Sequence, residues 1–329
     1  MITFLHIHCS QDHSEKILPL GILSVGSALR KKGYEVKLIN ISEKDIDRTV
    51  EEIIKNKPDY IGISVMTGIQ TRHSAEFSKK LKEKSNIPVV WGGIHPSFLP
   101  RQCLEEFYID FVVIGEGEET IIEFTRNFLA DKNFSSILGL GYKENGRVVL
   151  NPQRPLIADL DEWRLDFSLL DLEKFIFPLD RYKRAIAYKT SRGCPFRCAF
   201  CYNYEFNKAR WRVWSEEVVL EDINFLKEKY KIDAVKFYDD NFFVDRKRAV
   251  SLLKKINLPS HLEIRIDFID EALAKELKGL NIFDMLIGIE SGSDRLLQLI
   301  DKRFTVQRLL EGVRIIADNN LHASYSLMV

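Results

Sequence analysis

The sequence predicts an α/β protein with two parallel sheets in succession: an open, doubly wound sheet followed by a partial (β/α) barrel. Short apolar runs alternate with amphipathic helical patterns through the first 130 residues, and this alternation resumes with a different spacing from Arg184. Between the two regions lie a turn signal, two prolines and an acidic stretch. We therefore expect a first domain over residues 1–135, a connector with a hairpin over 136–182, and a second domain over 183–329.

The first domain is expected to contain five buried strands, each followed by an amphipathic helix. In the first helix Ile22, Val25 and Leu29 recur on one face. Five such units with short connections imply an open parallel sheet with helices on both faces, and ligands of these sheets bind beyond the carboxyl ends of the strands. The expected strands are Ile2–His8, Tyr34–Ile39, Tyr60–Val65, Pro88–Trp91 and Phe111–Ile114.

The alternation of strands and helices stops in the connector. Asn145-Gly146 lies between two short apolar runs, a pattern typical of a hairpin turn. Pro152 and Pro155 then interrupt regular structure, and the acidic stretch Asp159–Asp161 follows. We place the boundary between the domains here.

The second domain also alternates strands and helices, but its strands do not make a closed set. We therefore expect a partial barrel. The chain stops at Val329, inside an apolar run with no polar cap, which predicts at least one further strand-helix unit beyond this residue. The expected strands are Ala185–Lys189, Ala234–Tyr238, Leu262–Phe268, Met285–Ile289 and Ala323–Val329.

Composition narrows the class of protein. The 329 residues include 48 basic and 48 acidic side chains, and residues 1–150 hold 19 basic and 20 acidic ones. Neither half has the positive excess that favours nucleic-acid binding, so a nucleic-acid partner is not expected. No apolar stretch approaches the roughly 18 residues that span a bilayer. The N-terminus lacks the features of a signal peptide, so we expect a cytoplasmic protein.

Three of the five cysteines, Cys194, Cys198 and Cys201, fall within eight residues. The odd number of cysteines and the missing export signal argue against a disulfide framework. Three thiolates on one loop can converge on a soft metal centre. A closed four-iron cluster generally takes four cysteines, so three would leave one iron open for a substrate or cofactor. Cys9 and Cys103 are expected to be core thiols.

A structural zinc site and a chance group of buried cysteines are the alternatives at this point. Zinc in structural sites takes four ligands, often from paired C-x-x-C motifs. No fourth cysteine or histidine lies near the loop, since the next histidine along the chain is His261.

The spacing C-x-x-x-C-x-x-C, directly after the first strand of a β/α repeat and with an aromatic residue before the third cysteine, resembles the radical S-adenosylmethionine (SAM) superfamily. The resemblance implies a [4Fe-4S] cluster on Cys194, Cys198 and Cys201 whose open iron binds the methionine part of SAM. Reductive cleavage of SAM would then give a deoxyadenosyl radical that abstracts hydrogen from the substrate. The cofactor carries this chemistry, and the protein positions it.

Further positions match the superfamily strand by strand. A carboxylate after the second strand would face the SAM ammonium group, a basic residue on the third strand would face its carboxylate, and the end of the fourth strand would contact its ribose. For the acidic pair the alternative is a helix cap and turn, and for the basic residues it is solvated charge. The SAM contacts implied by the resemblance are Phe200, Asp239, Asp240, Arg265, Glu290, Ser291 and Lys302.

The N-terminal domain resembles that of the cobalamin-binding class of radical SAM enzymes. The resemblance rests on Gly92-Gly93-Ile94-His95, on the run Gly115–Thr120 and on the connector Asp159–Trp163. The D-x-H-x-x-G signature is missing, because Asp12-His13 has the wrong spacing, so cobalamin would be held without a histidine on cobalt. The implied cobalamin contacts are Ser64, Thr67, Gly92, Gly93, His95, Gly115, Glu116 and Gly117, with Cys9 as a further possibility.

A dinucleotide is not expected in this sheet. The first strand-helix turn, from His8 to Pro19, contains no glycine, so the phosphate cradle G-x-G-x-x-G is missing.

The resemblance, which covers nearly the whole chain, implies a cobalamin-dependent radical SAM enzyme that methylates an unactivated carbon. One SAM molecule would supply the radical and another would remethylate cobalt. Radical rearrangement, cyclisation and methylthio transfer stay open within this class. An iron-sulfur or corrinoid sensing module without catalysis is the alternative from another class, and a structural zinc protein is the third. The expected partners are a small-molecule or natural-product substrate and an electron donor such as flavodoxin or ferredoxin.

Overall fold

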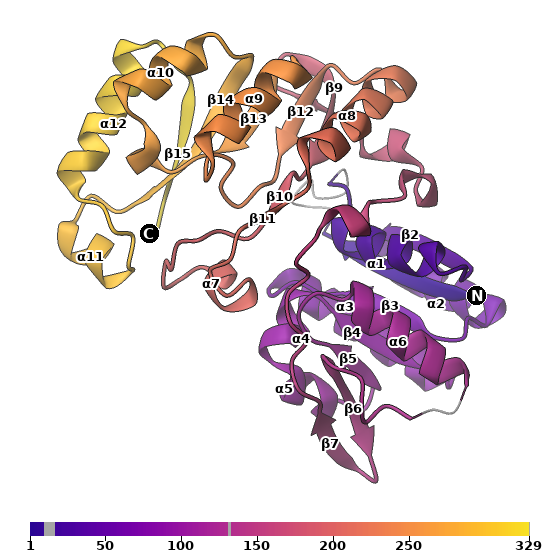
Figure 1. The fold of residues 1–329 in the computed structure, drawn as a ribbon. Helices are drawn as coiled ribbons and strands as arrows, with labels where there is room; N and C mark the ends of the chain where they lie inside the picture. The colour runs from indigo at the N-terminus through magenta and orange to yellow at the C-terminus, as the bar shows by residue number, and fades with distance from the viewer. Residues whose placement is uncertain (10–16, 131–132, 329) are drawn as a thin grey trace. The chain divides into compact units, whose positions relative to one another are not determined.

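The computed structural model describes residues 1–9, 17–130 and 133–328, and Asp12-His13 lies outside the described residues. The chain divides into two compact units, shown in Figure 1. The first unit comprises Met1–Ala158 and Glu162–Leu172, and the second comprises Asp159–Asp161 and Glu173–Val329. Each unit contains one main sheet.

The first unit is built on a seven-stranded sheet in the order β2-β1-β3-β4-β5-β6-β7. The first five strands in this order are parallel and confirm the predicted doubly wound sheet. The last two form the predicted hairpin, which pairs antiparallel with β5 and so extends the sheet. The strands are β1 (Ile2–His8), β2 (Val36–Ser42), β3 (Ile61–Ser64), β4 (Val89–Gly92), β5 (Phe111–Val113), β6 (Leu140–Glu144) and β7 (Arg147–Leu150).

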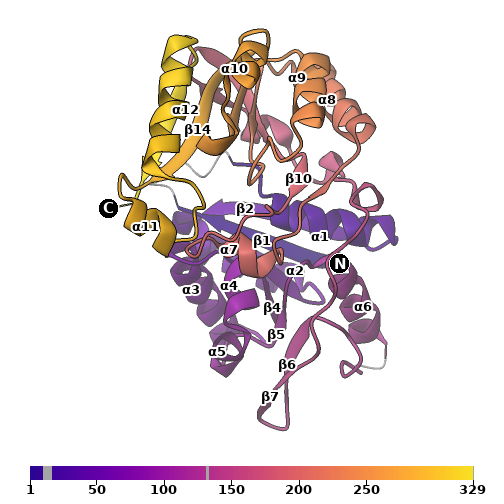
Figure 2. The ribbon, with the colours of Figure 1, turned by 60° about the vertical axis from the view of Figure 1, so that its left-hand side comes forward.

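Helices cover both faces of this sheet, as Figure 2 shows. One core cluster joins the sheet to α1 and α6, and a second joins it to α2, α3 and α5. The helices are α1 (Leu20–Lys31), α2 (Ile46–Asn56), α3 (Ile69–Lys84), α4 (Ile94–Phe98), α5 (Pro100–Glu105) and α6 (Glu118–Leu129). Short 3₁₀ turns are η2 (Glu43–Asp45) and η4 (Phe167–Leu169) in this unit, η5 (Leu172–Phe175) at its end, and η3 (Asp161–Trp163) in the connector.

The second unit has a six-stranded sheet in the order β15-β14-β13-β12-β9-β8, which forms the predicted partial barrel. Strands β9, β12, β13, β14 and β15 are parallel, and β8 joins the edge antiparallel. The strands are β8 (Phe177–Leu179), β9 (Tyr182–Tyr188), β12 (Ala234–Phe237), β13 (Ser260–Glu263), β14 (Ile282–Glu290) and β15 (Ala323–Leu327). A separate two-stranded ribbon pairs β10 (Ser191–Arg192) with β11 (Arg212–Val213).

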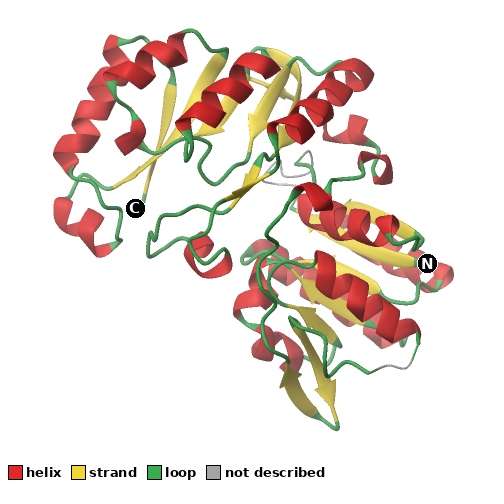
Figure 3. Cartoon of the chain, in the orientation of Figure 1, coloured by secondary structure: helices red, strands yellow, loops and turns green. Residues whose placement is uncertain are grey.

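Helices alternate with these strands along the chain, and Figure 3 shows them in red beside the sheet. They are α7 (Tyr202–Phe206), α8 (Glu216–Tyr230), α9 (Arg246–Ile256), α10 (Glu271–Lys278), α11 (Asp294–Leu299) and α12 (Val306–Asp318), with η6 (Ile266–Phe268) after β13. No helix in the part of the chain that the structure describes has both the length and the apolar character needed to cross a bilayer.

The predicted strand over Leu262–Phe268 is wrong in its second half. Strand β13 ends at Glu263, and Arg265 is the N-cap of η6. The alternation of apolar and polar residues continues beyond the strand, because Ile264 and Ile266 are buried, at 3% and 0% exposure, although they follow its end. Arg265 therefore lies beyond the end of the strand.

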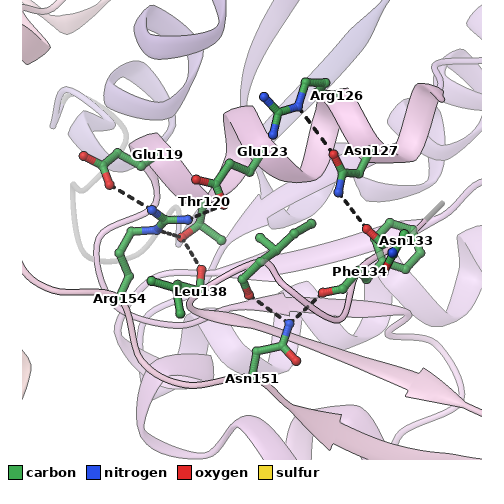
Figure 4. Close-up of polar contacts among 11 residues, drawn as sticks. Glu119, Thr120, Glu123, Arg126, Asn127, Asn133, Phe134, Leu138, Asn151 and Arg154 are labelled. Carbon is green, nitrogen blue, oxygen red and sulfur yellow. Dashed lines mark hydrogen bonds and ion pairs between the residues drawn. The ribbon is translucent and has the colours of Figure 1, made fainter. Parts of the chain in front are cut away.

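Polar side chains fasten the segment around the hairpin to helix α6, as Figure 4 shows. Arg154 follows β7 and donates hydrogen bonds to Thr120, Glu119 and Glu123 on α6. Asn151, which is 9% exposed, donates from Nδ2 to the backbone oxygens of Phe134 at 2.7 Å and Ile137 at 2.8 Å. One amide group thus satisfies two carbonyls in the segment between α6 and β6.

The Asn151→Ala variant should destabilise the first unit by about 1–3 kcal/mol, because it removes the shorter hydrogen bond of each carbonyl. Phe134 O and Ile137 O would keep only the longer bonds from the backbone N–H groups of Ile137 at 3.2 Å and Leu140 at 3.4 Å. Denaturant unfolding of the protein measures this change. The matched control is Asn127→Ala, which removes two exposed hydrogen bonds, one donated to the backbone oxygen of Asn133 and a long one accepted from Arg126 at 3.5 Å. We expect the control to stay within about 0.5 kcal/mol of wild type. Equal stability of the two variants would contradict the role assigned to Asn151.

Candidate functional site

The three clustered cysteines lie on one loop between β10 and α7. Cys198 is 8% exposed, and Cys194 and Cys201 are half-buried. The loop begins at Gly193, which has φ +89°, and a Cβ atom there would lie 2.0 Å from the backbone oxygen of Arg210. Only glycine fits this close approach, so the turn into the first cysteine depends on it.

Burial raises the pKa of the Cys194 thiol to about 11 and also raises the pKa of Cys201. Both thiols are therefore protonated at neutral pH in the absence of metal, and metal binding must displace their protons. Three soft ligands on a single loop fit an iron-sulfur cluster with one iron open, as the sequence predicts.

Asp240 joins the two ends of the cysteine loop. Its carboxylate accepts hydrogen bonds from the backbone N–H of Gly193 at 3.1 Å, just before the first cysteine, and from the Tyr202 hydroxyl at 2.7 Å, just after the third. It also pairs with Lys189 Nζ at 3.1 Å, at the end of β9. Burial alone would raise the pKa of Asp240, but Lys189 and hydrogen bonds from Tyr202 and Asn203 lower it, so the carboxylate stays charged.

Asp239 fixes the start of the same loop and is 1% exposed. It accepts hydrogen bonds from the Thr190 backbone N–H at 3.0 Å, from the Thr190 hydroxyl at 2.8 Å, and from the Ser191 hydroxyl. Burial raises the pKa of Asp239, while these donors oppose the rise. The predicted contact of Asp239 with SAM stays a prediction, since its hydrogen bonds in this structure go to the chain itself.

Arg265 contacts the middle of the cysteine loop. Its Nη1 lies 3.6 Å from Cys198 Sγ, and its guanidinium lies 3.7 Å from the centre of the Phe196 ring. The group also donates to Asp267 at 2.9 and 3.0 Å and to the Lys302 backbone oxygen at 2.7 Å. The structure thus places a cation beside Cys198, one of the predicted cluster ligands.

Two predicted SAM contacts, Glu290 at the end of β14 and Lys302 after α11, form a buried ion pair. Lys302 Nζ lies 2.8 Å from Glu290 Oε1, and the two side chains are 7% and 10% exposed. A Cβ atom at Gly288 would lie 2.3 Å from the same Glu290 oxygen, so glycine leaves the room for this pair. The Phe200 ring, on the cysteine loop and 48% exposed, lies 5.7 Å from Lys302 Nζ. Ser291, next to Glu290, accepts a hydrogen bond from the Ser293 backbone N–H.

The structure therefore gathers the predicted residues of the second unit around one loop. Asp239 and Asp240 hold its ends, and Arg265, Glu290 and Lys302 lie about its middle. The sequence reasoning missed Lys189 and Tyr202. The register of parallel strands β9 and β12, in which Tyr188 lies opposite Phe237, could have placed Lys189 beside the acidic pair.

The predicted cobalamin contacts lie at the last residues of β3 and β4 and in the loops that follow β3, β4 and β5. Backbone hydrogen bonds join Val65 to Gly92 at 2.8 Å and to His95 at 3.1 Å. The Ser97 hydroxyl accepts from the Gly115 N–H at 2.9 Å and so links the next loop. These bonds bring Ser64, Thr67, Gly92, Gly93, His95 and Gly115 to one edge of the sheet.

Two glycines shape this edge. Gly93 has φ +100°, and a Cβ atom there would lie 3.0 Å from the Val65 backbone oxygen. Gly115 has φ +81° with open space where a side chain would stand. A large flat ligand can approach the backbone here. His95 pairs with Thr67 at 3.2 Å, and burial lowers the pKa of His95.

Glu116 and Gly117 have other partners in this structure. Glu116 Oε2 accepts a hydrogen bond from the Ile157 backbone N–H at 2.8 Å. Gly117 is the N-cap of α6, and a Cβ atom there would lie 2.9 Å from a methyl of Val25 on α1. The cobalamin contacts predicted for these two residues stay predictions.

The Asp240→Ala variant should lose cluster-bound iron, because it removes the carboxylate that joins Gly193, just before the first cysteine, to Tyr202, just after the third. Residues that orient metal ligands typically contribute 10- to 100-fold to metal affinity, and we expect a loss of about that size. Iron and sulfide per chain, measured after anaerobic reconstitution at limiting iron and without SAM, test this. Asp270→Ala, which removes the N-cap of α10 and an ion pair with Arg246, should keep wild-type iron content. Wild-type iron content in Asp240→Ala would contradict the loop-anchoring role.

The Arg265→Gln variant should lower the reduction potential of the cluster by roughly tens of millivolts, because a cation beside a thiolate stabilises the more negative reduced state. A redox titration followed by electron paramagnetic resonance, without SAM, measures this. The control is Arg303→Gln, which removes an arginine that is 58% exposed and pairs with Asp301. An unchanged potential in Arg265→Gln would show that the contact with Cys198 does not tune the cluster.

Both units match families of known proteins. The model of the B12 binding domain matches residues 14–125, and the model of the Radical SAM superfamily matches residues 188–329. An uncharacterized methyltransferase of Pyrococcus horikoshii is 35% identical over 94% of this chain and 69% of its own length. An anaerobic magnesium-protoporphyrin IX monomethyl ester cyclase of Rubrivivax gelatinosus is 27% identical over 92% of this chain and 57% of its own length.

A solved structure shares the fold of the whole chain. The radical SAM methyltransferase TsrM from Kitasatospora setae, determined with cobalamin and a [4Fe-4S] cluster bound, superposes with a TM-score of 0.78 at 18% identity. The match covers 99% of this chain and 69% of that protein. Since a B12 binding domain and a Radical SAM domain follow one another here as the sequence predicts, the chain belongs to the family of cobalamin-dependent radical SAM enzymes.

Proposed function

We propose that this chain cleaves SAM reductively and transfers a methyl group to an unactivated carbon of a small molecule. The observation that carries the proposal is the cysteine loop, which follows the first parallel strand of the partial barrel. Asp240 holds this loop at both ends. A B12 binding domain precedes it. When bound, the cluster supplies the electron for SAM cleavage and the corrinoid carries the methyl group.

The residues of the chain would divide this work. Cys194, Cys198 and Cys201 bind the cluster. Phe200 and Ser291, with the ion pair of Glu290 and Lys302, bind SAM next to it. Separating a buried ion pair is costly if either charge is left without a partner. SAM carries both an ammonium and a carboxylate group, so it would supply a partner to Glu290 and to Lys302 when the pair opens.

The predicted domain limits, 1–135 and 183–329 with the connector 136–182, belong to this proposal. The proposal also includes a reduced flavodoxin or ferredoxin as the electron donor and a natural-product substrate. It further includes the absence of a nucleic-acid partner and a place in the cytoplasm. The balanced charge of the chain supports a substrate other than nucleic acid.

The experiment combines anaerobically reconstituted protein, hydroxocobalamin, SAM and a low-potential reductant, and measures the products of SAM by chromatography. We expect both deoxyadenosine and S-adenosylhomocysteine. The Cys198→Ser variant should reduce both to background, because the cluster lacks a ligand. A sample without cobalamin should form deoxyadenosine but little S-adenosylhomocysteine.

Other outcomes would assign the chain differently. Deoxyadenosine without S-adenosylhomocysteine in the complete mixture would exclude methyl transfer and favour a radical rearrangement or cyclisation, the chemistry named for the Rubrivivax relative. Intact SAM in a protein that binds both cluster and corrinoid would indicate a sensing module.

A further inference from the structure

A second group of metal-ligating side chains lies in the first unit, apart from the cysteine loop. Cys9, Glu43 and His73 each offer one ligand atom, and these three atoms lie within 4.8 Å of one another. All three residues are half-buried. Both Cys9 and Cys103 were expected to be core thiols. Cys103 is buried at 3% exposure, as predicted, but Cys9 is only half-buried.

The register of the sheet explains why Cys9 and Glu43 meet. Strands β1 and β2 are parallel neighbours, and their last residues, His8 and Ser42, lie opposite each other. Cys9 and Glu43 are the next residues after these two strands, so they lie side by side at the carboxyl edge of the sheet. Ser42 also caps the turn η2 by accepting from the Lys44 backbone N–H, which fixes the direction that the chain takes after β2.

The position of His73 follows from the attachment of α3 to the same strand. Gln70, in the first turn of α3, donates from Nε2 to the Ile7 backbone oxygen at 2.9 Å and lies 2.8 Å from His6 Nε2. His73 is three residues further along the helix and therefore lies on the same side. Its Nδ1 atom is buried and has no hydrogen-bond partner among the described residues. Such a nitrogen lacks the partner that a buried polar atom normally has.

The donor set has the chemistry of a zinc site. Thiolate, imidazole and carboxylate are the three side-chain ligands of zinc, and a site with three protein ligands keeps a fourth position for water. Bond lengths of about 2.0–2.3 Å place tetrahedral ligands about 3.2–3.8 Å apart. Separations of up to 4.8 Å reach this range by small rotations of the side chains.

We propose that Cys9, Glu43 and His73 bind one zinc ion at the carboxyl edge of the first sheet. Binding releases the thiol proton of Cys9 to solvent, and zinc undergoes no redox change. The ion would join the ends of β1 and β2 to helix α3 at the edge where a doubly wound sheet binds its ligand. This site is independent of the cysteine loop and does not rest on the proposed enzymatic activity.

The test measures zinc per chain in anaerobically reconstituted protein after incubation with zinc and desalting. The same measurement is made in a Cys194→Ala/Cys198→Ala/Cys201→Ala background, so that zinc bound to the cysteine loop cannot contribute. We expect about one zinc per chain in both, and at least about tenfold weaker binding in Cys9→Ser and in His73→Ala. X-ray absorption at the zinc edge should show one sulfur at about 2.3 Å with nitrogen and oxygen as the other ligands.

Cys103→Ala is the matched control, since it removes the other thiol of the first unit, and it should keep full zinc binding. Circular dichroism of each variant shows whether it is folded, and Glu43→Gln supplies a second variant that retains size and shape. Sub-stoichiometric zinc in the triple-alanine background would overturn the proposal. Undiminished zinc in folded Cys9→Ser and His73→Ala would do the same.

Discussion

The hydrogen bonds that Asp239 and Asp240 accept from the residues flanking the cysteine loop are the constraint on which the catalytic half of this chain depends. Two adjacent carboxylates are buried at the end of β12, and burial of charge is costly unless donors satisfy it. Here a lysine, two backbone N–H groups and three hydroxyls do so. Because these donors precede and follow the cysteines, the requirement to satisfy the buried charge also fixes the loop.

Buried charged groups are also satisfied by short polar contacts around the middle of the loop. Arg265 directs its guanidinium to Cys198, Asp267 and the Lys302 backbone, and Lys302 in turn reaches Glu290. Gly193 and Gly288 leave the space that these approaches require. Short polar contacts thus connect the predicted cluster ligand Cys198 with the charged groups around it.

Hydrophobic periodicity was enough to predict both parallel sheets, since buried strands of such sheets are continuous apolar runs. It failed where apolar residues are buried without a strand, as at Ile264 and Ile266. Cysteine spacing identified the loop because that signal is local. The partners of Asp240 were missed because Lys189 and Tyr202 lie far from it in sequence and meet it only through sheet register. The sequence pointed to Cys9 only as a core thiol or a cobalamin contact, and its proximity to Glu43 and His73 was missed for the same reason.

The most direct test of this account is the Mössbauer spectrum of the anaerobically reconstituted protein with and without SAM. Three cysteines on one anchored loop predict a [4Fe-4S] cluster in which a single iron site changes its spectrum when SAM is added, while the other sites do not. A spectrum that SAM leaves unchanged, or a preparation that contains zinc in place of iron and sulfide at the loop, would contradict it.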